Sequence, residues 1–441
     1  MVLPLNYRRP DHVNKDVLSH QDSVVSLDEK STSSLKSGQS GSSTGIPDAL
    51  AFDKIINGGT CPPCTVRDFM NYLIYIEHSA ENLQFFLWFR DYEKRFHLAP
   101  ISETVLAPEW TPTMEDETIA RIQRDAADKA RRDVTIAAEI FKGTDFEKAS
   151  DVVESRDPFS TPRHSEAADS ASFLSGSQGL SYRSQASDAF AAAGAKQPFT
   201  IQPFRSEINR VISTYFVDNA PRQLNLSSRE QKAIVRALSY TTHPSAFHTL
   251  SRNIETGLRR QAHPNFVRWT ICNGNPARVT FARGLGVGTI LLALIGSIIL
   301  TLSSAGRGWR ALLALLWVVG IATLITAWKG MCVVLHGLHH RHVRPWELFV
   351  DDNGTGVEFL GEGQRSFDSF GSSNSYEDEP WIVKYDHRFY VRKVFDREVW
   401  IQEPALRQIQ DTIFLQSLLM AVLGAGVLTA IFVAVPAGQF Y

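Results

Sequence analysis

The stretch FMNYLIYIEHSAENLQFFLWFRDYEKRF, residues 69–96, decides the fold of the N-terminal half of the chain. Phe69, Leu73 and Ile76 recur at the three- to four-residue spacing that is typical of a helix. The same spacing resumes at Leu83, after a short polar break. The stretch therefore predicts two helices that meet at a tight corner.

The polar break itself, EHSAEN at residues 77–82, suits both a helix start and a binding edge. The hydroxyl of Ser79 can accept from a free amide two or three residues on, and Glu81 is then favourable in the first turn. Short polar side chains fixed on helix ends also lose little rotamer entropy when they bind a partner. Composition leaves both interpretations open: a docking edge, or a capped turn whose acids are only solvated.

Charge and cysteine content limit the class of protein. The chain has 441 residues and a formal net charge of -2, so nothing attracts it as a whole to nucleic acid. Its four cysteines are too few and too scattered for a secreted disulfide framework. The first residues, MVLPLNYRRPDHVNKD, lack the apolar core of a secretory signal. We expect a reducing, cytosolic setting for the soluble part and no nucleic-acid partner.

Helical patterning covers residues 51–272 and is interrupted once. Residues 1–50 lack periodicity and apolar mass, which predicts a disordered tail. An insertion at 98–196 holds one helix at 114–142 and is otherwise mostly disordered from 155 onward. Helical patterns return at 204–216, 227–238 and 246–260, and Ser228 is expected to cap the second of them. The soluble half is predicted to be all-α.

Three later segments are long and apolar enough to cross a bilayer. They are residues 284–306, 311–328 and 412–436. A buried core helix is the alternative for each, but their glycines and other small residues suit helix packing in lipid. We expect three transmembrane helices.

Basic residues near the ends of these spans predict their orientation. Those that lie before the first span or after the second are Arg278, Arg283, Lys329, Arg341 and Arg344. The positive-inside rule therefore places the N-terminal half and the 329–411 loop in the cytosol, although Arg307 and Arg310 go against it. The Val, Tyr, Phe and Trp content of residues 381–403 predicts a small mixed β element in that loop.

Three motifs resemble regulator-of-G-protein-signalling (RGS) domains. Residues 69–96 are similar to the family signature, a Phe-led helix, a Glu-x-Ser-x-Glu-Asn corner and a second aromatic helix. QLNLSSRE at 223–230 resembles the family loop in which a Leu-Asn-Leu triplet precedes a Ser-initiated helix. HPNFVRWTI at 263–271 resembles the closing element, but Pro264 or Asn265 stands where an acid is common. An RGS-like bundle followed by three spans is similar in architecture to fungal bud-site-selection membrane proteins.

The resemblance implies a mechanism without a catalytic group. RGS domains grip the switch segments of a Gα subunit and hold its own glutamine, water and arginine in the transition-state arrangement. It implies that Ser79, Glu81 and Asn82 contact the switches from one side. Asn225 would take the place of the asparagine that reaches the Gα glutamine, and Arg268 would brace the far edge.

Two functions are expected from this reading. The first is a plasma-membrane RGS-domain protein that binds a Gα subunit and accelerates its GTP hydrolysis. The alternative is a non-catalytic polarity or bud-site landmark whose RGS-like domain binds another membrane protein. No nucleophile or acid–base constellation is recognisable in the sequence, so we do not expect an enzyme in its own right.

The remaining motifs indicate no cofactor and no metal. Cys61 and Cys64 have CxxC spacing, but no second pair lies nearby. The histidines of HGLHHRHVR, which are His336, His339, His340 and His342, are interpreted as a basic cuff near lipid headgroups rather than a metal site. GLGVG at 284–288 opens a span and so is not a dinucleotide loop. FSTPRHS at 159–165 is a candidate phosphorylation segment.

Overall fold

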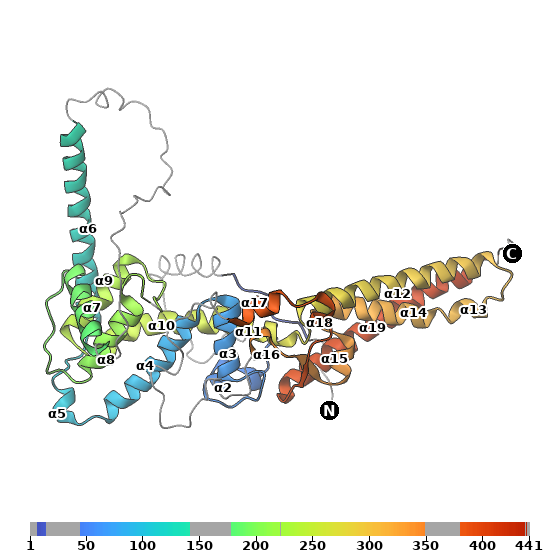
Figure 1. Cartoon of the computed structure of the whole chain (residues 1–441), viewed down its shortest axis with the longest axis horizontal. Coiled ribbons are helices and arrows are strands. Elements are labelled where there is room, and N and C mark those ends of the chain that lie inside the picture. Colours follow the sequence, from blue (N-terminus) through green and yellow to red (C-terminus); the bar gives the residue numbers. More distant parts are fainter. Residues whose placement is uncertain are drawn as a thin grey trace, which may run out of the picture. The chain divides into compact units, whose positions relative to one another are not determined.

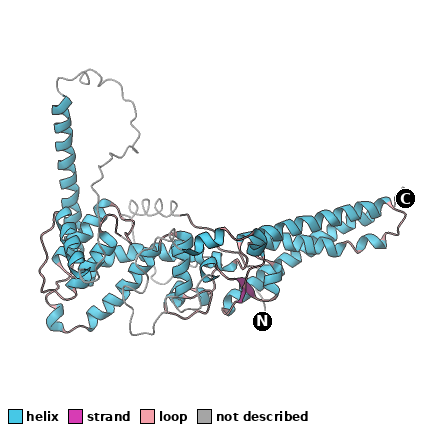
Figure 2. Cartoon of the chain, in the orientation of Figure 1, coloured by secondary structure: helices cyan, strands magenta, loops and turns pink. Residues whose placement is uncertain are grey.

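The computed structural model of the chain describes residues 7–14, 45–141, 178–220, 222–348, 380–436 and 438. These residues are mostly helical, which confirms the predicted class (Figure 2). They divide into two compact units, one formed by Met1–Leu83 with Ile254–Tyr441 and the other by Gln84–Asn253. We call them the membrane-proximal unit and the central unit. The RGS-like arrangement of the helices stays a prediction.

The central unit consists of helices and their connections (Figure 1). They are α4 (Ala80–Leu98), α5 (Ile101–Thr104), α6 (Pro112–Phe141), α7 (Gln178–Ala192), α8 (Arg205–Val211), the π-helix η4 (Ile212–Phe216), α9 (Ser228–Tyr240), the 3-10 helix η5 (Pro244–Phe247) and α10 (His248–Gly257). Helices α4 and α10 run across the two boundaries between the units.

Aromatic side chains form the core of the central unit. The ring of Phe85 on α4 lies 5.7 Å from that of Tyr215 and 5.9 Å from that of Phe247. Trp88 stacks on Tyr92 at 5.1 Å, one turn further along α4. Large rings bury much apolar area and favour such edge and offset contacts. The aromatic run that the sequence placed on one helix is therefore what holds this unit together.

Part of the predicted insertion is built into the central unit. Helix α6 packs against α9, and α7 contacts α8, η4 and α9. Ala186 and Phe190 on α7 are fully buried, although residues from 155 onward were expected to be mostly disordered. The 159–165 phosphorylation motif lies outside the described residues.

The cap of α9 lies one residue earlier than predicted. Ser227, rather than Ser228, accepts from the Glu230 amide, and Glu230 in turn accepts from the Ser227 amide at 2.9 Å. The two residues form a capping box, in which a Glu or Gln three positions after the cap reaches back to the cap amide. Gln231, which has that spacing from Ser228, instead donates to the Phe216 carbonyl at 2.6 Å.

The membrane-proximal unit joins the two ends of the predicted 51–272 domain to the C-terminal segments. Its elements before the spans are η1 (Asp48–Leu50), α2 (Phe52–Ile56), α3 (Val66–Tyr72), the π-helices η2 (Leu73–Glu77) and η6 (Leu258–Ala262), and α11 (His263–Ile271). From the first span onward they are α12 (Pro276–Leu302), α13 (Gly308–Ala311), α14 (Ala314–Trp328), α15 (Val333–Gly337), β1 (His340–His342), α16 (Pro345–Leu348), α17 (Pro380–Asp386), α18 (Tyr390–Val394), β2 (Glu398–Trp400) and α19 (Pro404–Ala434).

One hydrophobic cluster connects these pieces. Its buried members are Leu50, Cys64, Val267, Ile271, Met331, Ile401, Leu406, Ile409 and Ile413. The cluster takes residues from α11, from the loop after the second span and from the first turns of α19. The ends of the predicted RGS-like domain thus share a core with the base of the spans.

Among the described residues, three helices are long and apolar enough to span a membrane: Pro276–Leu302, Gly308–Trp328 and Pro404–Ala434. This confirms the three apolar helices predicted from hydropathy. All three begin earlier than expected, and the first and third do so because their first turns carry polar side chains such as Arg278 and Gln410, which are buried within the unit.

Arg310 fastens the turn between the first two spans to the last one. Its side chain is only 2% exposed, and its Nη1 group donates to the carbonyls of Phe432 at 2.9 Å and Val435 at 2.7 Å. Its Nε group donates to the Leu300 carbonyl at 3.3 Å. The guanidinium therefore satisfies carbonyls at the ends of α12 and α19 that have no partner within their own helices.

The predicted β element is smaller than expected. Strands β1 and β2 pair antiparallel with His340 opposite Trp400 (Figure 2). Within residues 381–403, where a few strands were expected, β2 is the one described strand, and two short helices, α17 and α18, precede it. The partner strand β1 lies within the histidine cluster, which carried no strand signal.

Candidate functional site

The predicted corner is a sharp reversal at His78. Helix α3 continues directly into the π-helix η2, and His78 ends it in the left-handed conformation with φ 52° and ψ 47°. The Nδ1 group of His78 donates to the Ile74 carbonyl at 2.9 Å, and the amide of Ser79 donates to the Leu73 carbonyl at 3.0 Å. These bonds close the end of the helix, so that α4 starts at Ala80 with Ser79 directly before it.

The corner side chains differ in how much of them faces solvent. Ser79 is only 5% exposed, whereas Glu81 and Asn82 are half-buried. Glu77 accepts from the Nε2 group of Gln261 at 2.7 Å. Burial is the largest cause that raises the pKa of Tyr72, and the negative charge of Glu77 is the next largest. Glu77 is therefore used inside the unit. Of the three predicted contact residues at the corner, Glu81 and Asn82 are more accessible to a partner than Ser79.

Asn225 lies in the central unit at the tip of a three-residue turn. The amide of Leu226 donates to the Leu224 carbonyl at 2.9 Å, and the amide of Leu224 donates to the Tyr215 carbonyl at 3.0 Å. Leu224 is buried while Asn225 is exposed. A tight turn between an anchored leucine and the capped start of α9 directs the asparagine outward.

Arg268 on α11 is held by the N-terminal segment. Its Nη1 group donates to the Pro10 carbonyl at 2.7 Å, and its own carbonyl accepts from Arg9 at 2.8 Å. Burial, with the nearby charge of Arg9, lowers the pKa of Arg268. The brace residue of the expected site therefore already has a partner inside the chain.

The N-terminal segment also contacts Asn265, one of the two residues that stand where RGS domains commonly have an acid. Asn265 is buried, and its side-chain amide exchanges two hydrogen bonds with the backbone of Val13, at 2.9 and 3.0 Å. Residues 7–14, within the predicted disordered tail, thus run along α11. The only sequence signal for this contact is the short NYRRP motif, whose aromatic and basic residues stand apart from the Ser-rich text after it.

Trp269 lies under the loop that follows the second span. The guanidinium of Arg344 is 3.6 Å from the centre of its ring, and Trp346 stacks on it at 6.0 Å. Trp346 also stacks on Tyr75 of η2 at 4.7 Å. Burial lowers the pKa of Arg344 to about 10. Part of the 329–411 loop thus covers the aromatic face of α11 and η2.

The five candidate residues are divided between the two units. Ser79, Glu81, Asn82 and Arg268 belong to the membrane-proximal unit, and Asn225 belongs to the central unit. Two of the five cannot contact a partner in this conformation, because Ser79 is buried and Arg268 donates a hydrogen bond to the Pro10 carbonyl.

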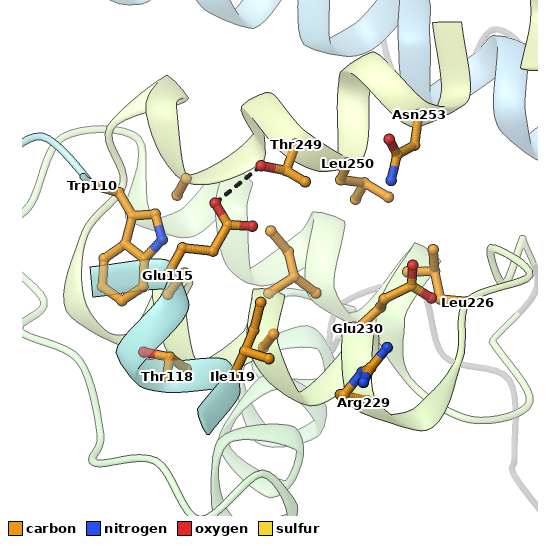
Figure 3. A pocket seen from close by; sticks show the side chains of 14 residues that line it. Trp110, Glu115, Thr118, Ile119, Leu226, Arg229, Glu230, Thr249, Leu250 and Asn253 are labelled. Carbon is orange, nitrogen blue, oxygen red and sulfur yellow. Dashed lines mark hydrogen bonds between the residues drawn. The ribbon is translucent and has the colours of Figure 1, made fainter. Parts of the chain in front are cut away.

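Sequence reasoning missed a cavity in the central unit, next to Asn225 in the chain. Its volume is about 270 Å³. Apolar side chains form its middle, and polar groups lie at its ends, where Thr249 donates to Glu115 at 3.0 Å (Figure 3). Its lining residues include Trp110, Ile119, Leu226, Arg229, Glu230, Ile234, Leu250 and Asn253. The periodic apolar positions of α6, α9 and α10 are the signal that could have indicated it.

The other candidate motifs have structural contacts. The amide of Cys61 donates to Glu403 at 2.8 Å, and burial raises the pKa of the Cys64 thiol, which disfavours the reactive thiolate. His336 and His339 both approach one oxygen of Asp411, at 3.5 and 3.3 Å. Within the described part of the chain, no group of three or more His, Cys, Asp or Glu side chains is placed to hold a metal ion.

Comparison with protein-family models gave no match, and searches of curated proteins and of solved structures found none significantly similar to this chain. The resemblance to RGS domains therefore depends on the three quoted motifs.

Proposed function

We propose that this is an integral membrane protein that binds a Gα subunit and accelerates its GTP hydrolysis. The observation that carries the proposal is the Asn225 turn. A short amide side chain held outward between an anchored leucine and a capped helix start loses little entropy when it binds. It is therefore suited to orient a glutamine of the partner.

The corner before α4 supports the same proposal. Glu81 and Asn82 lie in the first turn of α4, directly after the fixed reversal at His78. In this mechanism they hold a mobile switch segment of Gα, and the chain itself supplies no attacking group. The gain in rate comes from ordering groups that Gα already has.

The three apolar helices support a membrane location for the proposed activity. We place the three helices in the plasma membrane, with the N-terminal segments and the 329–411 loop on the cytosolic side. Tethering raises the effective concentration of the binding residues near a membrane-bound Gα subunit, so that a weak contact is sufficient.

The contacts of α11 favour a second candidate function, a landmark or scaffold for cell polarity. Arg268 is bonded to Pro10 and Trp269 is covered by Arg344 and Trp346, so the closing helix is part of a core. A chain that keeps the helices but uses this face internally would bind another membrane protein and leave GTP hydrolysis unchanged.

Single-turnover GTP hydrolysis by candidate Gα subunits separates the two functions. The full chain in lipid nanodiscs is the sample, because the ends of the expected domain share a core with the spans. We expect acceleration, and we expect Asn225→Ala and Asn82→Ala each to reduce it by at least about tenfold. Ser228→Ala, at an exposed residue in the first turn of α9, is the matched control and should retain the activity.

Binding to Gα loaded with a transition-state analogue decides the remaining case. If Gα neither binds nor hydrolyses GTP faster with the chain present, the Gα proposal is excluded. The scaffold then predicts that a fluorescent fusion still concentrates at sites of polarised growth when Asn82 and Asn225 are both alanine.

A further inference from the structure

Helix α18 is fixed beside the first turns of the first span. The hydroxyl of Tyr390 donates to the Ala277 carbonyl at 3.1 Å, and the rings of Phe395 and Phe281 meet at 5.8 Å. Asn275 donates to the Lys393 carbonyl, and Val394 is buried. The helix is therefore held in place on α12, about one turn before the uncharged run of that span begins.

Several large apolar side chains of this segment are exposed. Phe389 is 73% exposed, Phe395 64% and Val391 52%. Phe281 on α12 is also exposed, so the apolar surface continues from α18 onto the span. Large apolar side chains grouped at one place indicate an interaction surface, and aromatic rings are enriched where spans leave the hydrocarbon core.

The charges near this apolar surface are mainly positive. Arg392 on α18 and Arg397 after it are exposed, and among the described residues neither guanidinium group pairs with a carboxylate. The neighbouring acids are neutralised within the unit, because Asp396 pairs with Arg388 at 2.8 Å and Glu398 pairs with Arg278 at 2.8 Å. An exposed Asp386 is the nearest remaining acid on the preceding helix.

We propose that residues 389–397 form an interfacial element that inserts Phe389, Val391 and Phe395 into the leaflet at the start of α12 and binds anionic phospholipid headgroups through Arg392 and Arg397. Continuity with the span and the sign of the charge favour a lipid surface over a protein partner. A segment that exposes large apolar side chains and has basic groups close by in the chain is suited to the headgroup boundary. This inference requires that α12 crosses a bilayer, but it does not depend on Gα binding.

Depth measurement by spin labelling tests the insertion. The full chain with Cys61→Ser and Val391→Cys carries a nitroxide and is placed in phosphatidylcholine nanodiscs with or without phosphatidylserine. We expect the label to collide more with oxygen than with a water-soluble nickel chelate. A label at Asp386→Cys serves as the reference and should show the opposite preference. Phe389→Ser should move the label at 391 toward water, whereas Phe389→Trp should not.

Charge variants test the lipid class. Phosphatidylserine should increase the inserted fraction, and Arg392→Glu should remove that increase, whereas Arg392→Lys should retain it. Each basic group near an anionic surface changes the partition by about fivefold. The proposal is overturned if the nickel chelate collides with the label at 391 as often as with the label at 386 in both lipids. It is also overturned if the label inserts but phosphatidylserine leaves the inserted fraction unchanged. Loss of access to both reagents would indicate a protein cover and overturns it as well.

Discussion

His263 at the start of α11 is a buried histidine whose Nε2 group donates to the Leu50 carbonyl at 2.8 Å. Burial lowers its pKa to about 4, below the ordinary value near 6.5. The unfolded chain therefore binds a proton that the folded chain excludes, so stability is greatest above pH 6.5 and falls as the pH drops toward 4. At pH 5 we expect this residue to cost about 2 kcal/mol, measurable by denaturant unfolding of the detergent-solubilised chain.

A glutamine variant isolates this effect. His263→Gln keeps an N–H donor for Leu50 but cannot titrate, so stability at pH 7 should be retained and its loss between pH 7 and 5 should be reduced. Some loss remains, because burial and Arg278 also lower the pKa of His342 to about 4. An unchanged slope in His263→Gln would contradict the assignment.

At the residue scale, local patterns were predictable and distant partners were not. The Leu-Asn-Leu triplet indicated the turn at Asn225, and the polar break indicated the corner before α4. The sequence could not show that Arg268 is bonded to Pro10, because the two are far apart in the chain and a carbonyl acceptor has no sequence signature. For the same reason the sequence could not show that Arg310 donates to the carbonyls of Phe432 and Val435. Arg310 was therefore treated only as a basic residue that goes against the positive-inside orientation.

At the scale of elements, the first two spans pack closely against each other at two glycines. A Cβ atom on Gly320 would lie 2.8 Å from Ile290 Cγ1 and 3.1 Å from its backbone nitrogen, and one on Gly286 would lie 3.2 Å from the Gly320 carbonyl. Gly320→Val should therefore force α12 and α14 apart and lower the free energy of unfolding by about 1–3 kcal/mol. Unfolding by sodium dodecyl sulfate in mixed micelles measures this loss.

Gly288 on α12, the other helix of this pair, provides the matched control. A Cβ atom there would have nothing within 4 Å, so Gly288→Val should change stability by less than about 0.5 kcal/mol. Equal losses at positions 288 and 320 would mean that glycine flexibility, and not close packing of the two helices, determines the result.

Elements with a long apolar run were predicted well, and those without one were missed. Hydropathy identified the three spans because each apolar run alone exceeds the length of any soluble strand or turn. Helix α7 was missed because its Ser- and Ala-rich sequence has no apolar period, although Ala186 and Phe190 anchor it. Strand β1 was missed because His340, Arg341 and His342 have little β propensity, and only pairing with β2 makes them a strand.

At the scale of the whole molecule, one unit is built from two segments that are far apart in the sequence, Met1–Leu83 and Ile254–Tyr441. The resemblance to RGS domains treated residues 51–272 as one domain. In the structure the first and last parts of that range, including Cys64, Val267 and Ile271, pack with Ile409 and Ile413 of α19. Helical periodicity marks which face of a helix is buried, but it does not identify the helix that covers it.

A fragment of residues 80–257, which keeps α4 and α10 whole, should therefore fold without detergent and melt cooperatively when followed by circular dichroism. Its core is supplied from within, by Phe85, Tyr215 and Phe247. The longer fragment 51–272 should have no higher melting temperature, because the apolar face around Val267 and Ile271 has lost its partner on α19. That fragment should also bind a dye that reports exposed apolar surface. A higher melting temperature for 51–272 without dye binding would show that the range is one domain, and the division between the units would then be wrong.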